Sequence, residues 1–150
     1  MKCSVSIPIE GTKEDIWNVI TDIEHSEANI SAINKIEVLE HSESELNGFK
    51  WRETRTMFGK EATEVMWITE SEKNHYYKTR AESHGMIYVS TFTIDTEKDH
   101  EILTMGFEGE AQSFMGKVMN TVFGRMMMSS TEKAIMKDLE DIKNVVEHHH

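Results

Sequence analysis

Hydrophobic and polar residues alternate at the start of the chain with the two-residue period of a strand that buries one face. Cys3, Val5, Ile7 and Ile9 fall on one side of this period, and polar neighbours fall on the other. The alternation predicts a strand over residues 2–9. Its apolar side needs a cover from elsewhere in the chain.

The next segment changes to the three- and four-residue spacing of a helix. Its apolar residues are Ile16, Trp17, Val19, Ile20 and Ile23. Thr12 is the predicted N-cap, and Asp15 three residues later is its predicted capping-box partner. We expect a second short helix, capped by Asp22, to follow directly and to end near residue 30.

Six further segments have the alternation typical of strands. Their predicted bounds are residues 36–40, 49–57, 61–69, 75–82, 86–94 and 100–108. Short turns such as Phe58-Gly59-Lys60 and His84-Gly85 join them, and residues 95–99 are expected to form a polar loop. Consecutive strands with such short connections pair antiparallel, because parallel pairing needs a crossover of about a dozen residues or more.

The last segment, from about residue 111 to 146, lacks proline and repeats apolar residues at helical steps. This pattern predicts one long amphipathic helix. At about 1.5 Å per residue its length would exceed about 50 Å, so we expect a kink or break. Gly116, Gly124 and the run 129–131 are the predicted weak points.

The predicted order of elements is one strand, two short helices, six strands and a long helix. This order indicates an α+β fold in which a seven-stranded, curved antiparallel sheet wraps around the C-terminal helix. The outward sheet face is polar and suits water, so the helix is the expected cover of the apolar face.

Several local motifs accompany this order of elements. They are Asp15-Ile16-Trp17, Thr21-Asp22, Trp51-Arg52-Glu53-Thr54-Arg55, Trp67-Ile68-Thr69-Glu70, Asp138-Leu139 and Ile142-Lys143. With them the chain resembles the helix-grip fold of the START and birch-pollen-allergen-like (SRPBCC) superfamily, in its polyketide cyclase/dehydrase-like branch. The resemblance covers essentially the whole chain. It implies a cavity between sheet and helix for a lipid, polyketide or similar molecule, and no fixed catalytic residues.

Length and charge narrow the organisation and the partners. A chain of 150 residues suits one domain, expected over residues 1–146, and the Glu-His-His-His at 147–150 is typical of an expression-tag remnant. The formal net charge of −11 disfavours nucleic acid. No apolar run reaches the roughly 20 residues needed for membrane insertion, and without an apolar signal segment the expected location is the cytoplasm.

The candidate ligand-binding residues lie on apolar faces of the predicted strands and on one stripe of the long helix. They are Trp51, Glu53, Arg55, Tyr77, Tyr88, Phe92, Phe107, Met115, Met119 and Phe123. Six of the chain's 11 methionines fall in the helix, where flexible, polarisable side chains suit an adaptable apolar surface.

Glu53 and Arg55 share a strand face with Trp51, so an inward orientation would place both charges in an apolar space. Each charge then needs a partner. One interpretation is an anchor for a ligand's carboxylate, carbonyl or hydroxyl. The other is an ion pair satisfied within the protein, with Glu64, Tyr77 or Arg80 as further partners.

Three functional hypotheses follow. The leading one is a carrier or sensor that binds a small hydrophobic molecule between sheet and helix, as a monomer or weak homodimer. The second is a cyclase or dehydratase that uses cavity-facing Glu, Arg and Tyr side chains for acid–base chemistry. The third is a protein-interaction or chaperone-regulator module. No cofactor or metal is expected, because the histidines before residue 147 are scattered without ligand spacing.

Overall fold

We describe the protein from a computed structural model that covers residues 2–42, 46–112 and 114–148; between 114 and 127, Lys117 is the one side chain described. The elements in chain order are β1 (Lys2–Ile9), α1 (Lys13–Thr21), the 3₁₀ helix η1 (Ile23–His25), α2 (Ser26–Asn29), β2 (Ile33–Glu40), β3 (Lys50–Met57), β4 (Lys60–Glu72), β5 (Tyr76–Ser83), β6 (Met86–Glu97), β7 (His100–Ala111) and α3 (Phe114–His148).

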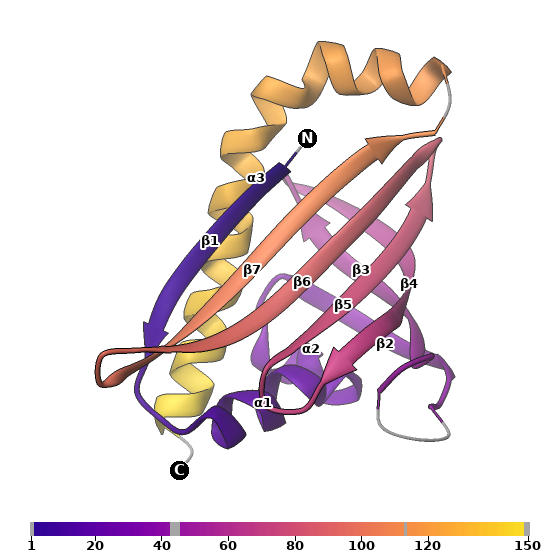
Figure 1. Ribbon diagram of the computed structural model, residues 1–150. Helices are drawn as coiled ribbons and strands as arrows, with labels where there is room; N and C mark the ends of the chain where they lie inside the picture. The colour runs from indigo at the N-terminus through magenta and orange to yellow at the C-terminus, as the bar shows by residue number, and fades with distance from the viewer. Residues whose placement is uncertain (1, 43–45, 113, 149–150) are drawn as a thin grey trace.

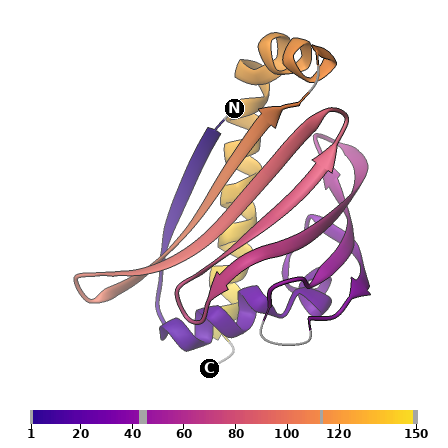
Figure 2. The ribbon, with the colours of Figure 1, turned by 45° about the vertical axis from the view of Figure 1, so that its right-hand side comes forward.

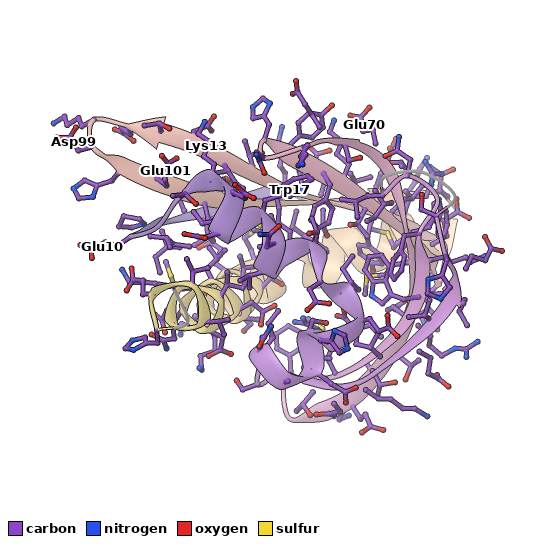
Figure 3. The ribbon with its side chains drawn as sticks, turned by 90° about the horizontal axis from the view of Figure 1, so that it is seen from below. Glu10, Lys13, Trp17, Glu70, Asp99 and Glu101 are labelled. Carbon is purple, nitrogen blue, oxygen red and sulfur yellow. The ribbon has the colours of Figure 1, made fainter. Side chains whose placement is uncertain are left out.

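The strands form one seven-stranded sheet in the order β1-β7-β6-β5-β4-β3-β2. Every neighbouring pair is antiparallel. The sheet curves around one side of α3, and α1 and α2 lie across its lower end (Figure 1; Figure 3 shows this end from below, with Trp17 of α1 labelled). The predicted α+β helix-grip architecture is therefore confirmed.

Several strands are longer than their hydrophobic pattern predicts. β2 begins at Ile33 rather than at residue 36, and β4 continues to Glu72. β6 extends to Glu97, so the predicted loop over 95–99 is wrong for its first part. The cause is backbone pairing: Glu97 still pairs with His100 although both side chains are exposed, and hydrogen bonding of the main chain requires no apolar side chain.

Two tight hairpins adopt the geometry that their residues predict. Phe58 and Gly59 have φ values of +53° and +78° between the paired residues Met57 and Lys60. Positive φ at both central residues is the requirement of a type I′ turn, whose twist matches that of the strands. The turn at 84–85 repeats this pattern, with φ values of +50° and +75°.

The predicted cap of the first helix is present. The Asp15 amide donates to Thr12 Oγ1 at 3.0 Å, and the Thr12 amide donates to Asp15 Oδ2 at 3.2 Å. The prediction for Asp22 is wrong, since its side chain makes no capping hydrogen bond. Its Oδ1 lies 2.8 Å from His25 Nδ1 instead, and the expected second helix divides into η1 and the short α2.

Helix α3 is bent, as its length predicts. Its first part crosses the upper end of the sheet, and its second part then runs down along the sheet (Figures 1 and 2). The second part packs against β1, β7 and α1. Its buried residues follow one another at three- and four-residue steps: Ile135, Leu139, Ile142 and Val146.

Among the described residues, no helix combines the length and apolar character required to cross a membrane.

The buried stripe of α3 predicts a large loss of stability in Leu139→Ala. Leu139 is 0% exposed within the main core, and removing such a side chain costs about 2–5 kcal/mol of unfolding free energy. Urea denaturation measures this loss. The control Glu140→Ala, at an exposed neighbour, should change stability by no more than about 0.5 kcal/mol. Equal losses in the two variants would contradict the packing of α3 described above.

Candidate functional site

A cavity of about 470 Å³ lies on the concave side of the sheet. Its wall comes from α1, η1 and α2 at one end, from strands β2 to β7, and from the second part of α3. This volume falls within the roughly 300–1,000 Å³ typical of small-molecule sites.

Alternation along the strands decides which side chains reach this cavity. On β3, Trp51, Glu53 and Arg55 line it, whereas Arg52 and Thr54 between them do not. The adjacent β4 presents the same parity, because Trp51 pairs with Met66 and Glu53 with Glu64, and both β4 residues are in the wall. The pleat of the sheet thus converts a period-2 sequence into one lining surface.

The candidate residues on the sheet all line the cavity: Trp51, Glu53, Arg55, Tyr77, Tyr88, Phe92 and Phe107. The side chains of Met115, Met119 and Phe123 lie outside the described residues. The wall also contains residues absent from the candidate set, among them Asp138, Thr79, Ser90, Met105 and Ile30. A ligand-binding role for any of them stays a prediction.

Arg55 is the centre of a buried charge cluster. Its Nε donates to Glu53 Oε2 at 2.9 Å, and its Nη2 donates to Asp138 Oδ2 at 3.0 Å. The side chains of Arg55, Glu53 and Asp138 are 18%, 10% and 6% exposed. Trp51 Nε1 also donates to Glu53 Oε1 at 3.3 Å. The cluster therefore joins β3 to α3 across the cavity wall.

The expectation that Glu64, Tyr77 or Arg80 would complete this ion pair is wrong. Arg80 falls on the opposite strand parity and pairs with Glu82 at 2.8 Å, where the two side chains are 37% and 54% exposed. Tyr77 donates its hydroxyl to the Ile20 carbonyl at 2.9 Å. The second partner of Arg55 is instead Asp138. Asp138 belongs to the motif Asp138-Leu139, but no local signal in the sequence indicates that it meets Arg55.

Two carboxylates share one guanidinium in this cluster. Burial disfavours the charged form of Arg55, but Glu53 and Asp138 outweigh it, so the Arg55 pKa is raised above its ordinary value. Burial also raises the pKa of Asp138, despite the opposing effect of Arg55. Arg55 thus remains a cation, and Asp138 takes up a proton more readily than an exposed aspartate.

The two cavity tyrosines remain neutral phenols. Burial, followed by the charge of Glu53, raises the pKa of Tyr77. Burial and the charge of Glu64 raise the pKa of Tyr88, whose ring stacks on Phe107 with centroids 5.6 Å apart. Neither hydroxyl is poised to act as a base at neutral pH.

Within the described residues, no group of three or more His, Cys, Asp or Glu side chains is arranged to hold a metal ion.

No family model matches the chain, and no curated protein matches it. Solved structures do match. A START superfamily protein from Mycobacterium smegmatis has a TM-score of 0.81 at 14% identity, covering 99% of each chain. The protein TTHA0849 from Thermus thermophilus has a TM-score of 0.79 at 11% identity, covering 99% of this chain and 98% of its own. The Zhui aromatase/cyclase from a Streptomyces species has a TM-score of 0.78 at 14% identity, covering 99% and 94%.

At these identities the likeness concerns the fold. The chain has the START-like, polyketide cyclase-like helix-grip fold that these structures share.

The charge cluster predicts that Arg55→Met destabilises the protein in a pH-dependent way. Two buried carboxylates lose their cation, which costs about 3–5 kcal/mol near pH 7. The pKa of Asp138 is already raised in the folded state and will rise further in the variant. Its protonation therefore stabilises the folded state at low pH, and this stabilisation is lost as pH rises through the folded pKa. Urea denaturation at about pH 5 should show a smaller loss than at about pH 7.

Arg80→Met is the matched control, because Arg80 forms a comparable pair on the exposed face. It should lose no more than about 1 kcal/mol at either pH. A loss in Arg55→Met that stays constant with pH would contradict the buried charges.

Proposed function

We propose that this protein binds a small hydrophobic molecule in the cavity between sheet and helix, as a carrier or sensor. The observation that carries this proposal is the cavity of about 470 Å³ inside a chain of 150 residues. An apolar ligand there would remove its own surface and that of the wall from water, which stabilises the complex by about 25 cal/mol per Å².

The side chains of the wall support the proposal. Met66, Phe92, Met105 and Phe107 point to the inner face of the sheet yet are only partly buried. A dense core would cover such groups almost completely. Their remaining exposed surface faces the cavity, where a ligand's apolar body would cover it.

The polar groups of the wall support a ligand that has one polar end, and they would fix its orientation in the cavity. Glu53, Arg55 and Asp138 lie together, so a ligand's polar end would meet them while its apolar body meets the aromatic and methionine side chains. A few convergent polar groups in a mainly apolar site are the usual basis of ligand orientation.

The fold comparisons are consistent with this function without specifying it. A START superfamily protein and an aromatase/cyclase both have this fold. The net charge of −11 supports a small molecule over nucleic acid as partner. We place the protein in the cytoplasm, as a monomer or weak homodimer, within the same proposal.

A cavity-filling variant tests ligand binding directly. Ser90 lines the cavity, whereas its neighbour Thr91 lies on the opposite face of β6. Ser90→Phe should weaken binding of the neutral fluorescent probe N-phenyl-1-naphthylamine by at least about tenfold, because the new ring occupies ligand volume. Native mass spectrometry of protein purified from its host should show a bound mass in the wild type that the variant lacks.

Thr91→Phe adds the same ring on the outer face and should leave probe affinity unchanged. Failure of the wild type to bind the probe or any apolar molecule would defeat the proposal. Equal weakening in both variants would place the probe outside the cavity.

A second candidate function is a cyclase or dehydratase. The observation that favours it is Asp138, a buried carboxyl of raised pKa that lines the cavity beside the Arg55 cation. Asp138 would accept a proton from the carbon between two carbonyls of a polyketide-like chain, and Arg55 would stabilise the resulting enolate oxygen. Attack of that carbon on a further carbonyl of the chain closes a ring, and the new alkoxide takes the proton back from Asp138. Loss of this hydroxyl with the remaining hydrogen of the attacking carbon releases water and leaves a carbon–carbon double bond.

This candidate predicts product formation that requires Asp138. Wild-type protein incubated with a linear poly-β-carbonyl compound should yield the cyclised, dehydrated product, measured by liquid chromatography and mass spectrometry. Asp138→Asn should lower the rate at least about a hundredfold, the usual size of a general acid–base contribution. A rate equal to the uncatalysed one in the wild type would leave ligand binding as the function.

A further inference from the structure

The cavity carries an excess of negative charge. Its charged lining residues are Glu53, Arg55, Lys60, Glu64 and Asp138. Three carboxylates therefore face two cations, and Lys60 is exposed to water. At the buried cluster the imbalance is sharper, because Glu53 and Asp138 share the single cation Arg55.

Asp138 has an unsatisfied acceptor at this point. Its Oδ2 accepts from Arg55, whereas its Oδ1 is buried and has no hydrogen-bond partner among the described residues. A buried acceptor without a donor costs about 1–3 kcal/mol, and more for a charged group. The Arg55 bond holds the carboxylate in place, and Asp138 is one of the residues in the wall of the cavity.

These charges argue against a ligand carboxylate at this place. Arg55 already donates to both neighbouring carboxylates, so an added anion would enter a site that is negative before it arrives. Like charges at short range in a poorly solvated space repel strongly. The guanidinium of Arg55 thus connects β3 to α3 and does not serve to bind a ligand's carboxylate.

We propose that the cavity selects a cationic amphiphile, whose apolar body fills the cavity and whose ammonium head lies beside the buried carboxylates of Glu53 and Asp138. This inference rests on the proposed binding function and specifies the ligand class for it. The ammonium balances the charge of the second carboxylate, because Arg55 alone compensates one of the two. The net charge of −11 raises the local concentration of cations around the protein and acts in the same direction.

The test compares three molecules that differ in the head alone: decylammonium, decanol and decanoate. Each competes with N-phenyl-1-naphthylamine for the wild-type protein, below its micelle concentration and at about 0.15 M salt, where distant surface charges are screened. We expect decylammonium to bind at least about tenfold more tightly than decanoate, a difference of about 1.4 kcal/mol. Decanol should lie between them.

Asp138→Asn leaves the shape of the side chain and removes the excess charge, so the affinity ratio of decylammonium to decanoate should fall close to one. Glu140→Gln is the matched control, since it removes the same charge two residues later at an exposed position on α3. It should keep the wild-type ratio. Glu53→Gln neutralises the other carboxylate of the cluster and provides a second variant if Asp138→Asn does not fold.

The outcomes separate the inference from the function on which it rests. If decanol and the neutral probe bind but decanoate equals or exceeds decylammonium, the head-group inference is overturned and ligand binding stands. A preference that persists in Asp138→Asn, or that Glu140→Gln also abolishes, assigns it to overall charge and likewise overturns the inference. If neither decanol nor the probe binds, the proposed function itself fails.

Discussion

The hydrogen bonds of Arg55 connect the two parts between which the cavity lies. One guanidinium holds Glu53 on its own strand and Asp138 on the C-terminal helix, at 2.9 and 3.0 Å. Charges with so little exposure persist only when they are paired. This pairing adds to the apolar packing that holds α3 against the concave sheet, and it places buried charges in the wall of the cavity.

The second part of α3 is tightly packed on one side, although a cavity lies beside it. Ile135, Leu139, Ile142 and Val146 are buried against the sheet and α1. Farther from this stripe, side chains such as Phe92 and Phe107 keep part of their surface uncovered. The buried stripe stabilises the fold. The exposed apolar surface of the cavity side chains is what a ligand could still bury on binding.

The buried charges make part of the cavity negative, although most of its lining is apolar. A neutral ion pair would orient a ligand weakly, whereas two carboxylates around one cation leave a negative site with an unsatisfied oxygen on Asp138. The two proposals use the same groups, one for the binding of a cation and the other for the transfer of a proton. Tyr77 and Tyr88 contribute shape and neutral hydroxyl groups, since the pKa of each is raised by burial.

Periodicity was sufficient to predict the order of elements and the parity of the strands, because side chains alternate across a pleated strand whatever the rest of the chain does. It therefore placed Trp51, Glu53 and Arg55 on one face of a strand, and the structure turns this face toward the cavity. It missed the strand ends that backbone hydrogen bonds extend through polar residues, as at the end of β6. The pairing of Arg55 with Asp138 spans 83 positions. No local pattern encodes such a distance, so only the tertiary packing of α3 against the sheet decided which carboxylate meets the guanidinium.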